Sequence, residues 1–312
     1  MTKEEIEDYV NAVVEHALSK VEYSNYFLSE IKGYAETAQE ACNEILYSHE
    51  RNPTKRQKSE VDNEIAAVLT RFMNDIDDFI TEELLRIEEN EKEYLKNVIE
   101  KTFGVNLVIP AAVIAMLSRV PMGTGGTPGS FGEHLSGKLR DIYNSMTNQS
   151  YVFGEDYDEL IDEYDGRFNA FNRGLDAEAE TMGYSLADEY DRIVFTKNDK
   201  KLPGYIWVSM LDTNTCLECA SLSGTRYEKI EDVPYHPRHD RCRCFPMVCT
   251  DEIADNIPES YSDWFEKQDD KAKYKILGKG RFKLYEQGMK FKQFVNNGKK
   301  TPLKDLEFNK NK

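Results

Sequence analysis

The residues best suited to chemistry in this sequence are four cysteines and a histidine between positions 216 and 244. A CxxC motif supplies Cys216 and Cys219, and an HxxCxC motif supplies His239, Cys242 and Cys244. Two cysteines three residues apart on a tight turn can direct both thiolates at one ion, and a later turn can bring the remaining ligands of a tetrahedron. In a chain of this length, the cluster predicts metal or redox chemistry rather than a disulfide framework.

The cluster offers more donors than one tetrahedral ion needs. The favoured ligand set for a zinc ion is Cys216, Cys219, His239 and Cys242. Cys244 is the alternative to Cys242, because two cysteines at i and i+2 seldom ligate one ion together, and His236 and Cys249 are in reserve. A structural zinc ion would stabilise a small domain by roughly 10 kcal/mol or more.

Three other interpretations of the cluster stay open: a redox CxxC pair, a nucleophilic pair of Cys216 with His239, and buried thiols without a metal. A redox CxxC normally opens a helix within a βαβ unit, and the sequence gives no sign of such a unit. Spacing alone does not support a nucleophile. Structural zinc is therefore preferred, and we expect no catalytic residues and no enzymatic activity.

Charged residues surround the cysteines. The guanidinium groups of Arg238, Arg241 and Arg243 could offset thiolate charge, or meet phosphate or carboxylate groups. Asp212 precedes the CxxC turn and is expected to accept hydrogen bonds from its backbone amides. Cys42 stands apart in a helical stretch, where we expect a buried, small apolar side chain.

The elements that must position these residues are helical up to about residue 200. Apolar residues recur at helical spacing in residues 6–21, 61–99 and 168–193. No proline or glycine interrupts residues 54–103, which predicts one long helix, or two with a bend, of about 45 residues and roughly 65 Å. Such a length favours an elongated bundle or a helix that packs on partner subunits, and a plain antiparallel bundle is the alternative.

The helical pattern breaks twice. Residues 121–132 read PMGTGGTPGSFG, which lacks the Gly-Lys-Ser/Thr ending of a phosphate-binding loop and suggests a linker or hinge. Residues 202–210 are strand-like, which places a domain boundary near residue 200. We expect an α+β protein, in which an elongated and mostly helical N-terminal region precedes a small cysteine-containing domain held by zinc. Its parts are a long-helix region (1–120), a glycine-rich hinge with a second helical region (121–200), and a Cys/His domain with a basic tail (201–312).

Composition narrows the class of protein. Hydrophobic residues make up 40% of the 312 residues, enough for a core and against wholesale disorder. The longest apolar run, Leu107 to Leu117, is far shorter than the roughly 20 residues of a membrane-spanning helix, so no membrane partner is expected. The first eight residues are acidic and polar, so we expect no secretory signal and synthesis in the cytosol.

Charge is distributed unevenly. The chain carries 40 basic and 57 acidic residues, yet residues 271–312 hold 13 basic and 3 acidic ones, which leaves a surplus of 27 acidic residues in the rest. An acidic body disfavours nucleic-acid binding as the main function, because a DNA duplex carries about one charge per 1.7 Å. The basic tail could contact phosphate, dock on an acidic partner, or be a solvated face.

The motif residues resemble the Mu F-like family of phage minor head proteins. The resemblance rests on Trp207, on Asp212 before Thr215-Cys216-x-x-Cys219, on Leu222-x-Gly224, on Pro234 and on His239-x-x-Cys242-Arg243-Cys244. Downstream it continues through Trp264 and Ile276-Leu277-Gly278-x-x-Arg281-x-x-Leu284-x-x-x-Gly288, so it covers residues 205–290.

The sequence departs from the family pattern in three places. Ser223 stands where the family has an Asp before the glycine, and Asp240 stands where it has a proline after the histidine. A His-Pro pair occurs three residues earlier, at His236-Pro237, so the family histidine is assigned to His239 by its spacing to Cys-Arg-Cys. The family's upstream Arg-Thr-Glu element is not evident.

The resemblance implies a structural function. Members of the family are low-copy components of tailed-phage heads that act in head morphogenesis at the portal vertex and the procapsid interior, and some leave with DNA at ejection. We therefore expect the phage portal protein and capsid or scaffold proteins as partners, and packaged DNA as a contact of residues 271–312. The expected location is the interior of the virion head, reached from the host cytoplasm during assembly. A toxin-like effector enzyme and a zinc-ribbon nucleic-acid-binding module are the alternatives.

Overall fold

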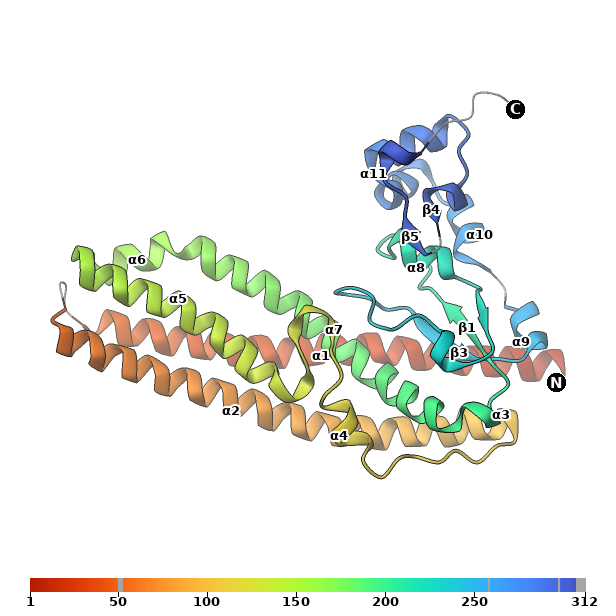
Figure 1. Cartoon of the computed structure of the whole chain (residues 1–312), viewed down its shortest axis with the longest axis horizontal. Helices are drawn as coiled ribbons and strands as arrows, with labels where there is room; N and C mark the ends of the chain where they lie inside the picture. Colours follow the sequence, from red (N-terminus) through yellow and green to blue (C-terminus); the bar gives the residue numbers. More distant parts are fainter. Residues whose placement is uncertain (50–52, 258, 297, 307–312) are drawn as a thin grey trace.

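The computed structural model describes residues 1–49, 53–257, 259–296 and 298–306. Figure 1 shows a long helical arm with a smaller lobe rising from the end that also carries the N-terminus. The described chain is mostly helical, with a few short antiparallel strands and the cysteines gathered in its C-terminal part. The expected α+β architecture is therefore confirmed. None of the described helices combines the length and the apolar character needed to cross a bilayer.

Two helices run along the arm, α1 (Lys3–Tyr47) and α2 (Lys55–Tyr94). Each helix is preceded by a threonine that caps its first turn. The threonine hydroxyl accepts a hydrogen bond from the backbone amide of the third helical residue, and the side chain of that residue accepts a hydrogen bond from the backbone amide of the threonine. Helix α2 continues through a π-helical turn, Leu95–Glu100, and through α3 (Lys101–Phe103). The long helix predicted for residues 54–103 is thus confirmed.

Three more helices complete the bundle: α5 (Phe131–Phe153) packs on α2, α7 (Asp165–Asn198) packs on α1, and the short α6 (Tyr157–Glu163) joins α5 to α7. A short helix, α4 (Val113–Leu117), lies against α2 and α7. Every third or fourth residue of α1 is buried, as its spacing predicts. Cys42 is one of these and is fully buried, as expected.

The approach of α7 to α1 depends on Gly183. A Cβ atom at this position would lie 2.9 Å from Cβ of Phe27 and 3.0 Å from Cα of Ser24. Both distances are shorter than packed carbon atoms tolerate, so the glycine lets the two helices approach closely. From here to Asp191 every residue of α7 is buried, because the cysteine region covers the face that α1 does not.

A three-stranded antiparallel sheet lies on this part of the arm. Strand β1 (Tyr205–Val208) is central, between β2 (Arg226–Tyr227) and β3 (Phe245–Val248). The hydroxyl of Tyr9, near the start of α1, donates a hydrogen bond to the carbonyl of Val248 at 2.5 Å. The first hydrophobic core accordingly runs without a break from Ile6 to Ile253, past the boundary expected near residue 200.

Apolar residues from Tyr261 onward form a second core together with Leu217 and Ala220. Short helices α9 (Asp251–Asp255) and α10 (Tyr261–Glu266), helix α11 (Asp270–Glu286) and the hairpin of β4 (Val295–Asn296) and β5 (Lys299–Lys300) follow β3. We call residues 259–296 and 298–306 the C-terminal lobe. Its core includes the buried side chains of Tyr261, Phe265, Leu277, Phe291 and Phe294. Up to residue 306 the expected basic tail is thus a folded lobe; residues 307–312 lie outside the described chain.

The glycine-rich segment at 121–132, expected as a linker or hinge, is packed against its surroundings. Gly125 lies against Phe131 and the Cβ of Glu178 on α7. The backbone amide and the hydroxyl of Thr124 both donate to the carboxylate of Asp240, at 3.0 and 2.8 Å. The segment therefore connects the arm directly to the loop that carries His239.

Candidate metal centre

The first pair of cysteines is held by helix α8 (Leu217–Leu222). Cys216 is the residue that caps this helix, and its sulfur accepts the backbone amide of Cys219 at 3.4 Å. One carboxylate oxygen of Asp212 accepts the amides of Asn214 and Thr215, at 2.8 and 2.9 Å. The expectation that Asp212 organises the CxxC turn is confirmed.

The second group of donors lies on a tight turn fastened to α7. The amide of Cys242 donates to the carbonyl of His239 at 3.1 Å, and Arg241 adopts a left-handed conformation with φ of 61°. The hydroxyl of Thr181 accepts the amide of Arg241 at 2.6 Å, and the hydroxyl of Tyr184 donates to the carbonyl of Arg243 at 2.8 Å. Helix α7 thereby fixes where the turn meets α8.

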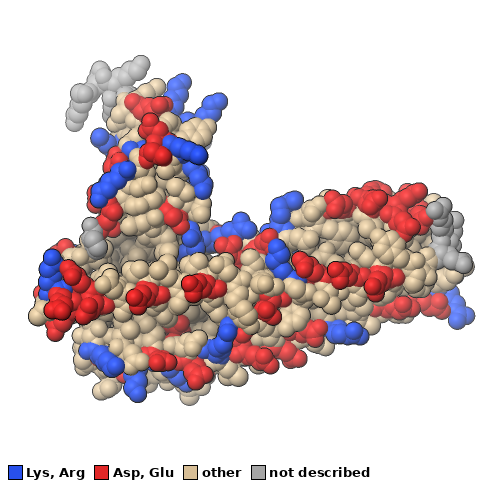
Figure 2. Space-filling view, turned by 180° about the vertical axis from the view of Figure 1, so that it is seen from behind, with Lys and Arg blue, Asp and Glu red and all other residues tan. Residues whose placement is uncertain are grey.

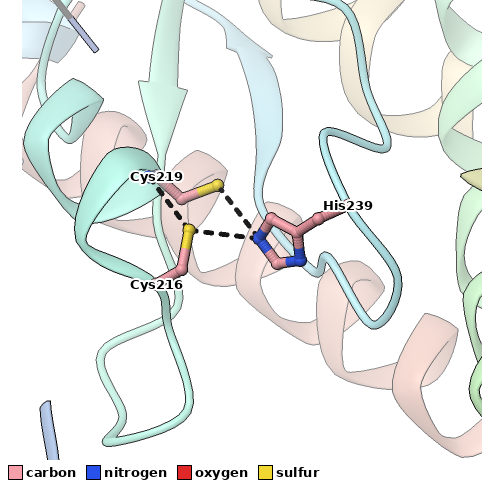
Figure 3. Close-up of side chains that lie close together, drawn as sticks. All are labelled: Cys216, Cys219 and His239. Atoms are coloured by element: carbon pink, nitrogen blue, oxygen red, sulfur yellow. Dashed lines mark hydrogen bonds between the residues drawn. The ribbon is translucent and has the colours of Figure 1, made fainter. Parts of the chain in front are cut away.

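All five predicted donors converge. Figure 3 shows the ring of His239 facing the two sulfurs of α8, and its Nε2 lies 3.1 Å from Sγ of Cys216 and 3.7 Å from Sγ of Cys219. Sγ of Cys219 also lies 3.7 Å from Sγ of Cys242. Two sulfurs on one tetrahedral zinc ion are about 3.8 Å apart, given Zn–S bonds of about 2.3 Å. The observed separations are thus of the size that a shared ion requires.

The donors form two groups that share one sulfur. Cys216, Cys219 and His239 make one group, and Cys219, Cys242 and Cys244 make the other; within each, all donor atoms lie within 4.8 Å of one another. The buried group of three cysteines could hold a metal ion. The favoured set of Cys216, Cys219, His239 and Cys242 spans both groups, with Cys219 common to them.

The i, i+2 pair behaves differently from the expectation. Cys242 and Cys244 both direct their sulfurs at Cys219, although only one of the two was expected to do so. The physical reason is that residues at i and i+2 of an extended chain point to the same side, and Cys242 and Cys244 directly precede strand β3. Cys244 therefore lies among the potential donors together with Cys242 and is not only its substitute.

The hydrogen bonds among the donors favour the thiolate at Cys216 and Cys242 and the thiol at Cys219, whose pKa is raised, first by the hydrogen bond with Cys216. The pKa of Cys216 is lowered to about 4, first because Cys219 donates a hydrogen bond to its sulfur and also because His239 lies beside it. The pKa of Cys242 is lowered as well, with the contact from Cys219 as the largest cause. The contact with Cys216 raises the pKa of His239 to about 11. A bound cation would balance the negative charge of the thiolates in place of the protonated imidazole ring of His239.

A backbone contact orients the histidine for ligation. Nδ1 of His239 lies 2.7 Å from the carbonyl oxygen of Asp240, to which it can only donate. This contact directs Nε2 toward the sulfurs, and it is the arrangement that metal-binding histidines usually show.

The three flanking arginines meet carboxylates, one of the outcomes left open by the sequence. Arg243 pairs with the second oxygen of Asp212 at 2.7 Å and so links the two halves of the centre. Arg241 pairs with Glu180 at 2.9 Å, and Arg238 lies 3.6 Å from Glu218.

The two reserve donors belong to neither group. His236 is fully enclosed beside Trp207 and Tyr184, with Nδ1 3.6 Å from Asp188. Cys249 follows β3, where burial raises its pKa to about 11.

Sequence reasoning missed a set of buried charged residues inside the arm, on α1, α2 and α7. Lys20 and Glu91 each occupy a position in a buried and mostly apolar helical stripe, between Ala17 and Ser24 and between Ile87 and Leu95. A charged residue at a core position was the signal that could have revealed them.

No family model matches this sequence, and no curated protein or solved structure matches it either. The resemblance to the Mu F-like family therefore rests on the motif residues alone and stays a prediction.

Proposed function

We propose that this chain is a structural protein, a minor head protein of a tailed phage or prophage, in which a zinc centre fixes a basic lobe to a helical arm. One observation carries the proposal. Cys219 belongs to the first core, whereas its neighbours Leu217 and Ala220 belong to the core of the C-terminal lobe. The cysteine cluster thus lies where the arm meets the lobe.

The contacts around the centre support this function. The hydroxyl of Tyr261 in the lobe donates to the carbonyl of Asp212 at 2.8 Å, and Lys275 donates to Thr213 and Asn214 at 3.0 Å. The guanidinium of Arg238, on the loop that carries His239, donates to the carbonyl of Gly298 at 3.1 Å. An ion bound at the cluster would therefore hold two segments that also anchor the lobe.

The donor chemistry favours zinc. Thiolates with an imidazole form the set that zinc prefers in closed, structural sites, where four protein ligands leave no position for a substrate. The chain offers five converging donors, one more than such a site needs. A structural centre accordingly agrees with a protein that assembles and does not catalyse.

The shape and charge of the molecule support contacts with a large assembly. Figure 2 shows acidic side chains along the arm and lysine and arginine side chains around the lobe. Nine lysines of the lobe are exposed, and none of them forms an ion pair within the described part of the chain: Lys271, Lys275, Lys279, Lys283, Lys290, Lys292, Lys299, Lys300 and Lys304. A long arm suits portal, capsid or scaffold subunits, and exposed lysines suit packaged DNA or an acidic partner surface.

Proteomics of phage particles tests the proposal. After prophage induction in the host strain, particles are banded by density and peptides of this chain are quantified against the major capsid protein. We expect low-copy recovery in DNA-filled heads. Recovery only from the soluble cytosol or the medium would overturn the proposal and favour an effector, with Cys216 and His239 as the residues to test for activity.

The exposed lysines also favour a second candidate, a nucleic-acid-binding module. This candidate predicts duplex binding that weakens steeply with salt, because lysines displace counterions from phosphate. Replacing Lys279, Lys292, Lys299 and Lys304 with glutamine leaves both cores intact and should abolish binding at low salt. Unchanged binding in this variant would exclude the lobe as the contact surface.

A further inference from the structure

A second set of potential metal ligands lies inside the arm, separate from the cysteines. Nε2 of His16 on α1 lies 2.9 Å from Oε2 of Glu91 on α2. Donor atoms of these two residues and of Asp191 on α7 all lie within 4.8 Å of one another. The ring of His16 stacks on Tyr94 with centroids 3.6 Å apart, which holds its orientation.

The buried charges around these donors do not balance. The ammonium group of Lys20 lies 2.5 Å from the carboxylate of Asp188 and 3.4 Å from that of Asp191. Lys20 is buried together with three carboxylates, those of Glu91, Asp188 and Asp191, so one positive charge faces three negative ones. A surplus of two negative charges in a dry environment is costly unless a cation or protons offset it. Other ionisable groups near Asp188 include Tyr184, Glu189, which adds negative charge, and His236.

An unused acceptor and a small space mark where a cation would fit. Asp191 is 7% exposed, and its Oδ1 atom accepts no hydrogen bond from any described residue. A cavity of ≈ 20 Å³ is lined by His16, Lys20, Tyr94, Asp188 and Asp191, together with apolar residues of the core. This volume is about that of a single water molecule or ion.

We propose that His16, Glu91 and Asp191 bind a divalent first-row metal ion at the point where α1, α2 and α7 meet beneath the sheet. One imidazole and two carboxylates form a harder donor set than the cysteine cluster and suit Mn²⁺ as well as Zn²⁺. The double charge of the ion equals the surplus of the buried carboxylates. Each helix contributes one ligand, so the ion would fasten the three helices together.

Manganese distinguishes this site from the cysteine centre, because thiolates select zinc over manganese. The full chain is expressed in medium supplemented with Mn²⁺ and without added Zn²⁺, because Zn²⁺ binds such donors more tightly than Mn²⁺ and would displace it. The chain is then desalted and its bound metals are counted, with Mn²⁺ followed by electron paramagnetic resonance. We expect close to one Mn²⁺ per chain in the wild type. His16→Ala and Asp191→Asn should each reduce retained Mn²⁺ at least tenfold.

The control is His134→Ala, which removes the histidine of another interhelical pair, 3.1 Å from Glu178, and should retain the ion. Asp191→Asn conserves shape and removes one buried charge, so it keeps the test valid where His16→Ala does not fold. A wild-type chain without Mn²⁺, or equal Mn²⁺ in wild type and Asp191→Asn, would show that protons alone balance the carboxylates and would overturn the proposal.

Discussion

Replacing Cys219 with serine is the sharpest test of the cysteine centre. Its sulfur is the only donor common to both groups, lying 3.7 Å from Nε2 of His239 and 3.7 Å from Sγ of Cys242. Cys219→Ser should therefore abolish metal binding at the cysteine centre, because it removes a donor from both groups. Cys249→Ser is the matched control, because Cys249 is a buried thiol of the same region outside both groups.

The expected loss of stability follows from linkage. An ion present at about a thousand times its dissociation constant stabilises the folded chain by about 4 kcal/mol, and this contribution disappears in the variant. At roughly 2–4 °C per kcal/mol for a chain of this size, the melting temperature should fall by about 8–16 °C. We expect this fall to stop short of complete unfolding, because the first core, with Trp207 and Tyr205 on β1, buries many apolar residues besides Cys219.

The assay combines metal counting with thermal unfolding in the presence and absence of a chelator. Wild type and Cys249→Ser should each carry close to one zinc ion per chain at the cysteine centre and lose stability with chelator. Cys219→Ser should carry none there, and in a Cys219→Ser/Asp191→Asn chain chelator should leave the melting temperature unchanged. Zinc retained by Cys219→Ser could be bound by His16, Glu91 and Asp191, which are intact in this variant. The count is therefore repeated in a Cys219→Ser/Asp191→Asn chain. Zinc that remains bound to this double variant would refute the reasoning.

Three further predictions concern the packing and chemistry around the centre. Gly183→Ala should destabilise the chain by about 1–3 kcal/mol in urea unfolding, because its Cβ would meet Phe27, whereas Gly137→Ala, where nothing lies within 4 Å, should not destabilise it. Asp212→Ala should weaken zinc binding by about 10–100-fold in a competition titration, and equal affinity would deny that Asp212 orients the ligands. The pKa of Cys216 near 4 keeps its thiolate present at about pH 5, where an ordinary thiol is protonated; metal-free protein should therefore react with iodoacetamide at that pH, and added zinc should block the reaction.

Local patterns in the sequence were sufficient for the helices and for the identity of the donors. Apolar residues at steps of three and four over residues 61–99 predicted the long helix, because helical periodicity is a property of neighbouring residues. Asp212 was assigned to the CxxC turn on the same basis, since a carboxylate that caps a turn acts over two or three residues. The five donors were all named from residue type and spacing.

Only the tertiary structure decided which distant parts of the chain these elements contact. The first core crosses residue 200 because α1 and α7, distant in sequence, both pack beneath the sheet. The sharing of Cys219 between two donor groups depends on how α7 places the turn at Arg241. The carboxylates of Glu91 and Asp191 lie together because three helices converge there. Contacts of this kind arise between residues far apart in the chain, so no local pattern contains them, and packing alone brings them together.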